Sequence, residues 1–152
     1  MATKYRGSDS EELALSTFIR LTRSAEAVAE RTFRREPLPA GITVTQFGVL
    51  EALHHVGPMC QSELGRKILK TKGSISMVVD RLTGAGLVER KRNREDRRYQ
   101  EVCLTEEGRE LISSYFPRYA LALAQEFTVL SVEDQETLGI LCRRLGTKEE
   151  QP

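Results

Sequence analysis

A dense run of positive charge near the middle of the chain limits, more than any other feature, how this sequence can fold. The run Arg90–Arg98 (RKRNREDRR) holds six Lys or Arg residues and two carboxylates in nine positions. Alone, such a run is most often a solvated loop. Its flanks, Leu87–Lys91 and Gln100–Thr105, have the pattern of short strands, and Val102 and Leu104 alternate onto one face of the second. The sequence therefore predicts a β-hairpin with a basic tip.

Two short helices are expected directly before this hairpin. The first opens at Met59–Glu63, and the second begins after Thr71, which with Ser74 forms a helix cap, and ends at Gly84–Gly86. Two short helices joined by a tight turn form a helix-turn-helix, and a basic hairpin directly after them makes a winged helix. The apolar positions at helical spacing are Leu64 and Ile68 in the first helix and Ile75, Val78, Val79 and Leu82 in the second.

A long helix is expected near the start of the chain. It runs from about Ser10 to Arg35, with Ser8 and Asp9 as candidate caps, and stops at the proline-containing segment EPLPAG. A helix of this length has more apolar face than a small chain covers by itself, so we expect a partner subunit. A second helix begins at the capping box formed by Thr43 and Gln46.

The chain after the wing is also expected to be helical. Thr105 caps a long helix with a bend at Pro117, and a last helix follows Ser131 and Asp134, which cap it. We therefore expect a single domain over residues 1–152, with a winged helix-turn-helix lobe at residues 42–105 and a helical dimerisation lobe at residues 9–36 and 106–146. The positions expected to face inward in the last helix are Leu138, Leu141, Cys142 and Leu145.

The net charge of +1 over 152 residues conceals a strong local imbalance. Residues 61–99 carry a net charge of +6, and the rest of the chain carries −5. A local excess of this kind is the electrostatic footprint expected for a polyanionic partner. The longest unbroken apolar stretch has six residues, Tyr119–Ala124, whereas a membrane span needs about 20. Because the start MATKYRGSDSEEL also lacks the apolar core of a signal peptide, we expect a cytoplasmic protein.

The sequence contains no arrangement typical of an enzyme or a metal site. No nucleophile stands beside a base in a catalytic motif, and no glycine loop with phosphate-binding spacing follows a strand. His54 and His55 would point about 100° apart on a helix, and no cysteine or carboxylate nearby in the sequence completes a ligand set. We therefore expect no enzymatic activity, no cofactor and no metal.

The segment Val78–Gly108 (VVDRLTGAGLVERKRNREDRRYQEVCLTEEG) resembles the winged-helix core of the multiple-antibiotic-resistance regulator (MarR) family. It carries the DxR wing tip at Asp96 and Arg98 and the LTxxG motif from Leu104 to Gly108, and the upstream segments ITVTQFGVLEAL and GPMCQSELGRKI match as well. The resemblance extends over Phe18–Leu145. It implies a mainly α fold with a small β-hairpin wing and dimerisation helices from both chain ends. It also implies a homodimer on a pseudo-palindromic double-stranded operator, usually acting as a repressor.

The expected DNA contacts follow from the winged helix. Its second helix fits the major groove, which is about 12 Å wide, and the wing reaches the adjacent backbone or minor groove. The resemblance adds that Asp96 braces Arg98 as that arginine enters the minor groove. Members of the family often carry Arg or a polar residue at the position of Met77, so base recognition here depends more on thymine methyl groups. The expected DNA-binding residues are Ser62, Lys72, Gly73, Ser74, Ser76, Met77, Arg81, Arg94, Asp96, Arg97 and Arg98.

The family resemblance also points to an effector cavity between the dimerisation helices and the winged helix. Tyr and His side chains in an apolar cleft suit a planar phenolic or carboxylate ligand, although each is individually more often a packing residue. The candidate residues are Phe18, Thr22, His54, His55, Tyr115 and Tyr119.

Two alternatives stay open at this stage. Cys60 occupies a helix-capping position where Thr or Ser is usual, and a thiol at a helix N-terminus can react with oxidants or electrophiles, so a redox-sensing repressor is one alternative. The other is a winged-helix module that binds protein and not DNA, which would not need six cations at its tip. Cys103 and Cys142 are interpreted as packing residues.

Overall fold

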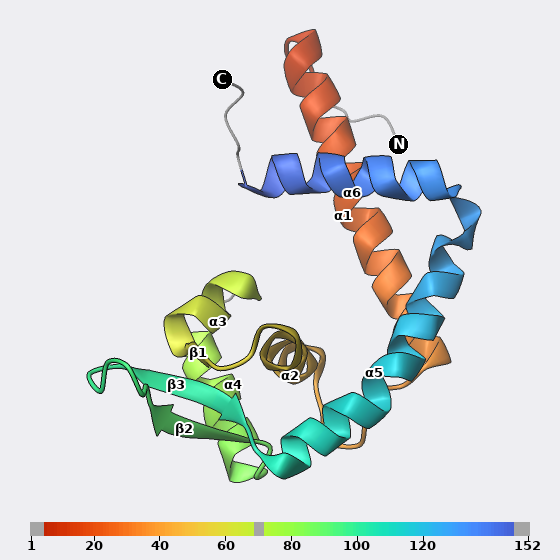
Figure 1. Cartoon of the computed structure of the whole chain (residues 1–152). Coiled ribbons are helices and arrows are strands. Elements are labelled where there is room, and N and C mark those ends of the chain that lie inside the picture. The colour runs from red at the N-terminus through yellow and green to blue at the C-terminus, as the bar shows by residue number, and fades with distance from the viewer. Residues whose placement is uncertain (1–4, 69–71, 148–152) are drawn as a thin grey trace. The chain divides into compact units, whose positions relative to one another are not determined.

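The computed structural model describes residues 5–68 and 72–147. The chain divides into two compact units. The winged unit is Pro37–Tyr119, and the terminal unit combines the segments up to Glu36 and from Ala120 onwards. The elements in chain order are α1 (Asp9–Arg35), α2 (Val44–Val56), β1 (Met59–Cys60), α3 (Gln61–Lys67), α4 (Lys72–Gly84), β2 (Val88–Arg92), β3 (Gln100–Leu104), α5 (Glu106–Glu126), the short 3-10 helix η1 (Phe127–Val129) and α6 (Val132–Thr147) (Figure 1).

Helix starts follow the capping residues of the sequence. Ser8 and Glu11 form a reciprocal capping box at α1, in which the Ser8 N–H donates to the Glu11 carboxylate at 2.7 Å. Thr43 and Gln46 form the predicted box at α2, with the Thr43 N–H donating to Gln46 Oε1 at 2.8 Å. Each box satisfies N–H groups that have no partner within the helix. The cap predicted at Thr71 lies outside the described residues.

The wing is part of a three-stranded antiparallel sheet in the order β1-β3-β2. The hairpin strands lie within a residue of their predicted bounds, and their register runs from Val88 opposite Leu104 to Arg92 opposite Gln100. The prediction that Met59 begins a helix is wrong. Met59 is instead a strand residue that pairs with Val102, and its side chain is buried against the sheet's apolar face. This pairing is long-range, so the local pattern gave no signal for it.

The core of the winged unit lies where α2, α4 and the sheet meet (Figure 1). Helix α4 buries one face completely at Ile75, Val79 and Leu82, as its apolar spacing predicts, whereas Val78 is only half-buried. Burying such a side chain stabilises the fold by about 1.5–3 kcal/mol, so this face fixes the rotation of α4 about its own axis. The other buried apolar residues of this core are Phe47, Val49, Leu50, Leu53, Met59, Leu64, Val88, Val102, Leu104, Ile112 and Tyr115.

In the terminal unit, two arginines hold the end of α5 to α1. Glu126 is almost fully buried, and its carboxylate accepts from Arg31 Nε at 2.5 Å and pairs with Arg35 Nη2 at 3.1 Å. A buried carboxylate needs such partners because the loss of hydration is otherwise uncompensated. Within the described residues, no helix is both long and apolar enough to cross a membrane.

The apolar face predicted for α6 is present, but no other part of the chain that the structure describes covers it. Ser131 caps the helix as expected, accepting from the Asp134 N–H at 3.1 Å. The expectation that Leu141 and Leu145 point inward is wrong for the single chain, since their exposed fractions are 52% and 63%. Leu138 and Cys142 are exposed as well. Helical periodicity identifies an apolar face without identifying what covers it.

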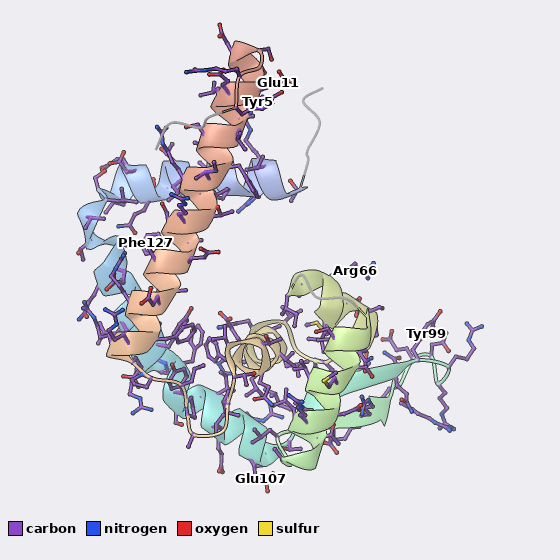
Figure 2. The ribbon with its side chains drawn as sticks, turned by 180° about the vertical axis from the view of Figure 1, so that it is seen from behind. Tyr5, Glu11, Arg66, Tyr99, Glu107 and Phe127 are labelled. Atoms are coloured by element: carbon purple, nitrogen blue, oxygen red, sulfur yellow. The ribbon has the colours of Figure 1, made fainter. Side chains whose placement is uncertain are left out.

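A tight joint closes the wing onto the start of α5 (Figure 2, in which Tyr99 marks the wing and Glu107 the first turn of α5). The Thr105 hydroxyl donates to the Gly86 carbonyl at 2.6 Å and accepts from the Gly108 N–H at 3.0 Å, and the Thr105 N–H donates to the Leu87 carbonyl at 3.1 Å. Gly108 packs so closely that a Cβ atom placed there would lie 1.9 Å from the Leu87 oxygen. In the LTxxG motif, the Thr is therefore needed for these hydrogen bonds, and the Gly is needed because a larger residue would not fit against Leu87.

Replacing Gly108 by alanine is expected to destabilise the protein strongly, because the new methyl group meets backbone and not a flexible side chain. We expect a loss of about 1–3 kcal/mol or more in the free energy of unfolding, measured by urea denaturation. Gly84→Ala is the matched control, since no atom beyond its chain neighbours and its own turn of helix lies within 4 Å of its Cβ position, and it should not destabilise the protein by more than about 0.5 kcal/mol. Equal effects of the two substitutions would contradict the steric explanation.

Candidate nucleic-acid interface

Helix α4 presents a polar and sparsely covered face opposite its buried face. Gly73 and Arg81 are exposed, Ser74 and Ser76 are half-buried, and Met77 has an exposed fraction of 55%. The backbone of Lys72 begins the helix. Five of the predicted contact residues therefore share one accessible side of this helix. An exposed helix with small residues at its start can approach the floor of a groove closely.

The start of α3 brings Ser62 beside Cys60. Ser62 is exposed, and its hydroxyl oxygen lies 3.0 Å from the Cys60 sulfur, while the Cys60 N–H donates to the Glu63 carboxylate at 2.9 Å. Cys60 therefore occupies the capping position that the sequence predicts. A reactive role for its thiol stays a hypothesis, because the described contacts are those of an ordinary helix start. Cys103 is half-buried, and burial raises the pKa of its thiol.

At the wing tip, Asp96 holds Arg98 through a two-pronged contact. Arg98 Nε donates to Asp96 Oδ1 at 3.0 Å and Nη2 donates to Oδ2 at 2.8 Å. These hydrogen bonds lower the pKa of the Asp96 carboxyl. The Arg98 side chain nevertheless keeps an exposed fraction of 83%. Because Asp96 already holds one edge of this planar guanidinium, the side chain loses fewer conformations when its other edge binds a partner than a free arginine would.

The remaining cations of the charged run fall into two groups. Arg90 donates to Asp80 Oδ1 on α4 at 2.6 Å and to Gln61 Oε1 on α3 at 3.2 Å, and Lys91 pairs with Glu89 at 2.6 Å. These two cations are engaged within the protein. The second group lines a shallow concavity of about 340 Å³ at the wing and consists of Arg92, Arg94 and Arg97 around Asn93.

The prediction of the interface from the sequence was incomplete in two respects. It did not include Arg92, which lines the wing concavity together with Arg94 and Arg97. It also treated all six cations alike, although Arg90 is tied to Asp80. Strand alternation gives no signal for this division, because it places Arg90 and Arg92 on the same face of β2 and Lys91 on the other. The partner Asp80 lies on another element and could not be read from local spacing.

Four of the six candidate effector residues come together in the winged unit. The Phe47 ring lies 5.4 Å from that of Tyr115 and 4.8 Å from that of Tyr119. The His55 ring lies 4.5 Å from Phe116, and His54 is the neighbour of His55 at 5.0 Å. Tyr115 is fully buried. Phe18 and Thr22 belong to the terminal unit, where Thr22 donates to the Phe18 carbonyl within α1.

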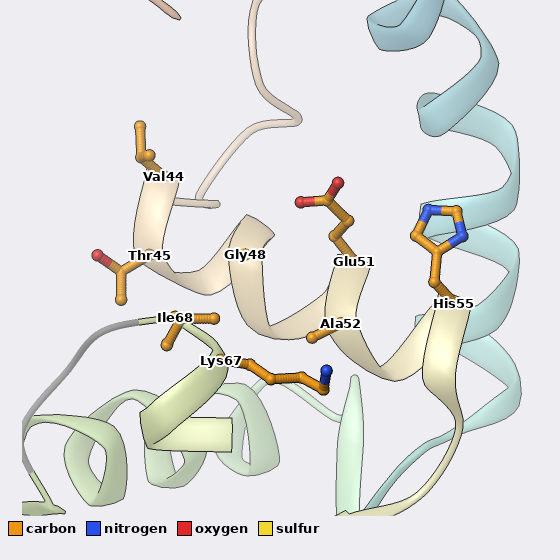
Figure 3. Close-up of a pocket in the computed structure, with 8 residues that line it drawn as sticks. All are labelled: Val44, Thr45, Gly48, Glu51, Ala52, His55, Lys67 and Ile68. Carbon is orange, nitrogen blue, oxygen red and sulfur yellow. The ribbon is translucent and has the colours of Figure 1, made fainter. Parts of the chain in front are cut away.

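A groove of about 520 Å³ runs along the outer face of α2 (Figure 3). Burial raises the pKa of the Glu51 carboxyl, an effect that the charge of His55 opposes, and burial together with the charge of Glu51 raises the pKa of Tyr119. His55 is the only one of the six candidates among the described lining residues. These residues are Val44, Thr45, Gly48, Glu51, Ala52, His55, Lys67 and Ile68. In the described part of the chain, no cluster of three or more His, Cys, Asp or Glu residues is placed to hold a metal ion.

Comparison with known proteins gives a consistent result. The sequence profile described as MarR family matches residues 40–98. The HTH-type transcriptional regulator MhqR of Bacillus subtilis (strain 168) is 34% identical over 140 residues, which are 92% of this chain and 96% of that protein.

Solved structures show the same fold. A MarR family transcriptional regulator from Streptomyces coelicolor, solved in complex with DNA, superposes with a TM-score of 0.74 at 27% identity and covers 97% of this chain and 93% of its own. NadR in complex with 4-hydroxyphenylacetate has a TM-score of 0.76 at 24% identity, covering 99% of this chain and 100% of its own. The chain thus belongs to the MarR family of winged helix-turn-helix, DNA-binding transcriptional regulators, which are not enzymes.

Proposed function

We propose that this protein is a homodimeric repressor, acting in the cytoplasm, that binds a pseudo-palindromic operator and leaves it when a small aromatic effector binds. The observation that carries the proposal is the pairing of an exposed face on α4 with an arginine-rich wing in one compact unit. A helix and an adjacent basic hairpin can occupy a major groove and the backbone beside it at the same time.

The proposed contacts divide into two kinds. Ser76, Met77 and Arg81 on α4 would meet base edges, with Lys72, Gly73 and Ser74 at the helix start and Ser62 on α3 against phosphates. On the wing, Arg94 and Arg97 would contact the backbone, while Arg98, held by Asp96, would enter the minor groove. The Streptomyces coelicolor relative was solved in complex with DNA, which supports DNA binding by a chain of this fold.

The proposed dimer explains the uncovered apolar residues of the terminal unit. Phe18 on α1 and Ile140, Leu141 and Leu145 on α6 have exposed fractions between 52% and 63%. Apolar surface of this extent is typical of an interaction site. If two copies bury it against each other, the two-fold symmetry places the recognition helices in successive major grooves, about 10 bp apart.

The proposed effector is a small phenol or related aromatic compound. NadR was solved with 4-hydroxyphenylacetate, which supports this ligand class. The candidate residues of the winged unit are His54, His55, Tyr115 and Tyr119, of which His55 lines the α2 groove, and those of the terminal unit are Phe18 and Thr22. Glu51 supplies a desolvated carboxylate, which can accept a hydrogen bond from a phenolic hydroxyl. The effector releases DNA only if it binds the incompetent state more tightly than the DNA-bound state.

Arg98→Ala is expected to weaken binding to all DNA sequences and to lower the salt dependence. Each lost phosphate contact reduces the slope of log affinity against log salt by about 0.9. Fluorescence anisotropy on operator and random duplexes at several salt concentrations measures both quantities. Arg34→Ala, which removes an arginine paired with Glu30 on α1, is the control and should leave the slope unchanged. An unchanged slope together with an unchanged operator affinity in Arg98→Ala would exclude Arg98 at the wing tip from binding.

Met77→Ala should change the preference among operators, because a side chain that meets a base edge discriminates by about 1–3 kcal/mol. Affinities for a set of operators with single base-pair changes provide the measurement. The salt slope should stay that of the wild type, since no cation is lost. Equal weakening on every operator would refute the assignment of Met77 to base recognition.

Leu141→Glu should shift the dimer towards monomer and thereby lower operator affinity, because a carboxylate would be buried in an apolar interface. Sedimentation velocity at micromolar concentration measures the shift. Arg143→Gln is the matched control: it changes the net charge by the same amount and lies about 200° further round the helix. A wild-type chain that is monomeric under these conditions would disprove the dimer.

Glu51→Gln should stabilise the protein at neutral pH, and the gain should vanish in acid. The pKa of Glu51 is raised in the folded state, so folding favours the protonated carboxyl, and this advantage is lost as the pH rises through the folded pKa. Glutamine keeps the neutral form at every pH. Melting temperatures at pH 8, 6 and 4 test this, with exposed Glu110→Gln as the control. A gain independent of pH would contradict it.

A further inference from the structure

The turn at the tip of the wing is organised by the side chain of Asn93. Its Oδ1 accepts two backbone N–H groups, those of Glu95 at 2.8 Å and Asp96 at 2.9 Å. Its Nδ2 donates to Glu101 Oε1 on β3 at 2.5 Å. The side chain is half-buried, unlike the exposed Arg92 and Arg94 on either side. Asn93 therefore ties the loop to the middle strand of the sheet through three hydrogen bonds.

These bonds continue outward to the arginine at the tip. The Asp96 backbone is fixed by Asn93, and the Asp96 carboxylate accepts both the Arg98 N–H at 3.0 Å and the Arg98 guanidinium. The main chain closes behind them, since the Asn93 N–H donates to the Tyr99 carbonyl at 2.9 Å. The result is a continuous set of contacts from Glu101 in the sheet through Asn93 and Asp96 to Arg98. A loop held in this way presents its cations in a fixed arrangement, which lowers the entropy lost on binding.

The chemistry of the position requires an amide. One end of the side chain must accept from backbone N–H groups, while the other must donate to a carboxylate. Aspartate could perform the first task, but its second oxygen would face Glu101 across 2.5 Å, where two carboxylates repel. Alanine could perform neither task.

We propose that Asn93 is a positioning residue for DNA binding, which does not touch DNA but sets the geometry in which Arg94, Arg97 and Arg98 meet it. This inference rests on the proposed function of the wing. The observation specific to it is the reciprocal fit of the Asn93 amide between two backbone N–H groups and the Glu101 carboxylate.

Exchanging the amide and the carboxylate between positions 93 and 101 tests the proposal. Asn93→Asp replaces the donor by a carboxylate and should weaken operator binding by on the order of tenfold. Glu101→Gln keeps an acceptor for Asn93 and should bind at least as well as the wild type. In the double variant N93D/E101Q, the new glutamine amide can donate to the new aspartate, and the net charge equals that of the wild type.

The expected result is that the double variant binds about tenfold more tightly than the product of the two single effects predicts. Effects that multiply would show that charge alone acts and would overturn the role of Asn93. Asn93→Ala, which changes no charge, should also weaken binding, while its melting temperature should stay close to that of the wild type because the loop is outside the core. Wild-type affinity in Asn93→Ala would overturn the proposal as well.

The affinity of Arg98→Ala for the same operator distinguishes a failure of the positioning role of Asn93 from a failure of the proposed function of the wing. If that variant binds like the wild type, the proposed function of the wing fails, and the role of Asn93 fails with it. If Arg98→Ala binds weakly while the Asn93 and Glu101 effects multiply, only the positioning role is disproved.

Discussion

The contact between the first turn of α5 and the backbone at Gly86–Leu87 determines how the winged unit closes. Three hydrogen bonds of Thr105 meet there, and Gly108 leaves no room for a side chain. The turn that ends α4 and begins β2 is thereby tied to the end of β3 and the start of α5. Because α4 is also fixed by its buried face, its rotation and its distance from the wing are both set. A DNA-reading surface made of two separate elements needs this rigidity.

The cations of the charged run divide into those that pair with carboxylates of the protein and those that can face an external partner. Arg90 and Lys91 neutralise carboxylates of the protein, whereas Arg92, Arg94 and Arg97 gather around the wing concavity. The field that a polyanion meets is therefore set less by the six cations of the run than by the few at the tip. At physiological ionic strength, exposed charges are screened beyond about 8 Å, so the position of these few cations matters more than the overall charge of +1.

Whether a feature of the fold or of the interface could be predicted from the sequence depended on whether the contact that determines it is local in the chain. The caps at Ser8 and Thr43 were predictable because their partners lie three residues away, and the wing strands were predictable because they flank one charged turn in a single hairpin. The strand at Met59 was not, because a two-residue strand exists only through its pairing with Val102. The apolar face of α6 was predictable as a face, but its exposure was not, since periodicity carries no information about a partner. The contacts of Arg90 with Asp80 and of Asn93 with Glu101 join separate elements and left no pattern in the sequence.

Helix α5 gives the proposed regulation a physical route, because it is the one described element whose residues belong to both units. Its first turn is locked to the wing by Thr105, and its last turn is held to α1 through Glu126. Between them, Phe116 and Tyr119 contact the histidines and Phe47 of α2. Under the proposed function, an effector beside α2 acts on the middle of a helix with two anchored ends. The effector can then release DNA only if it binds one arrangement of these contacts more tightly than the other.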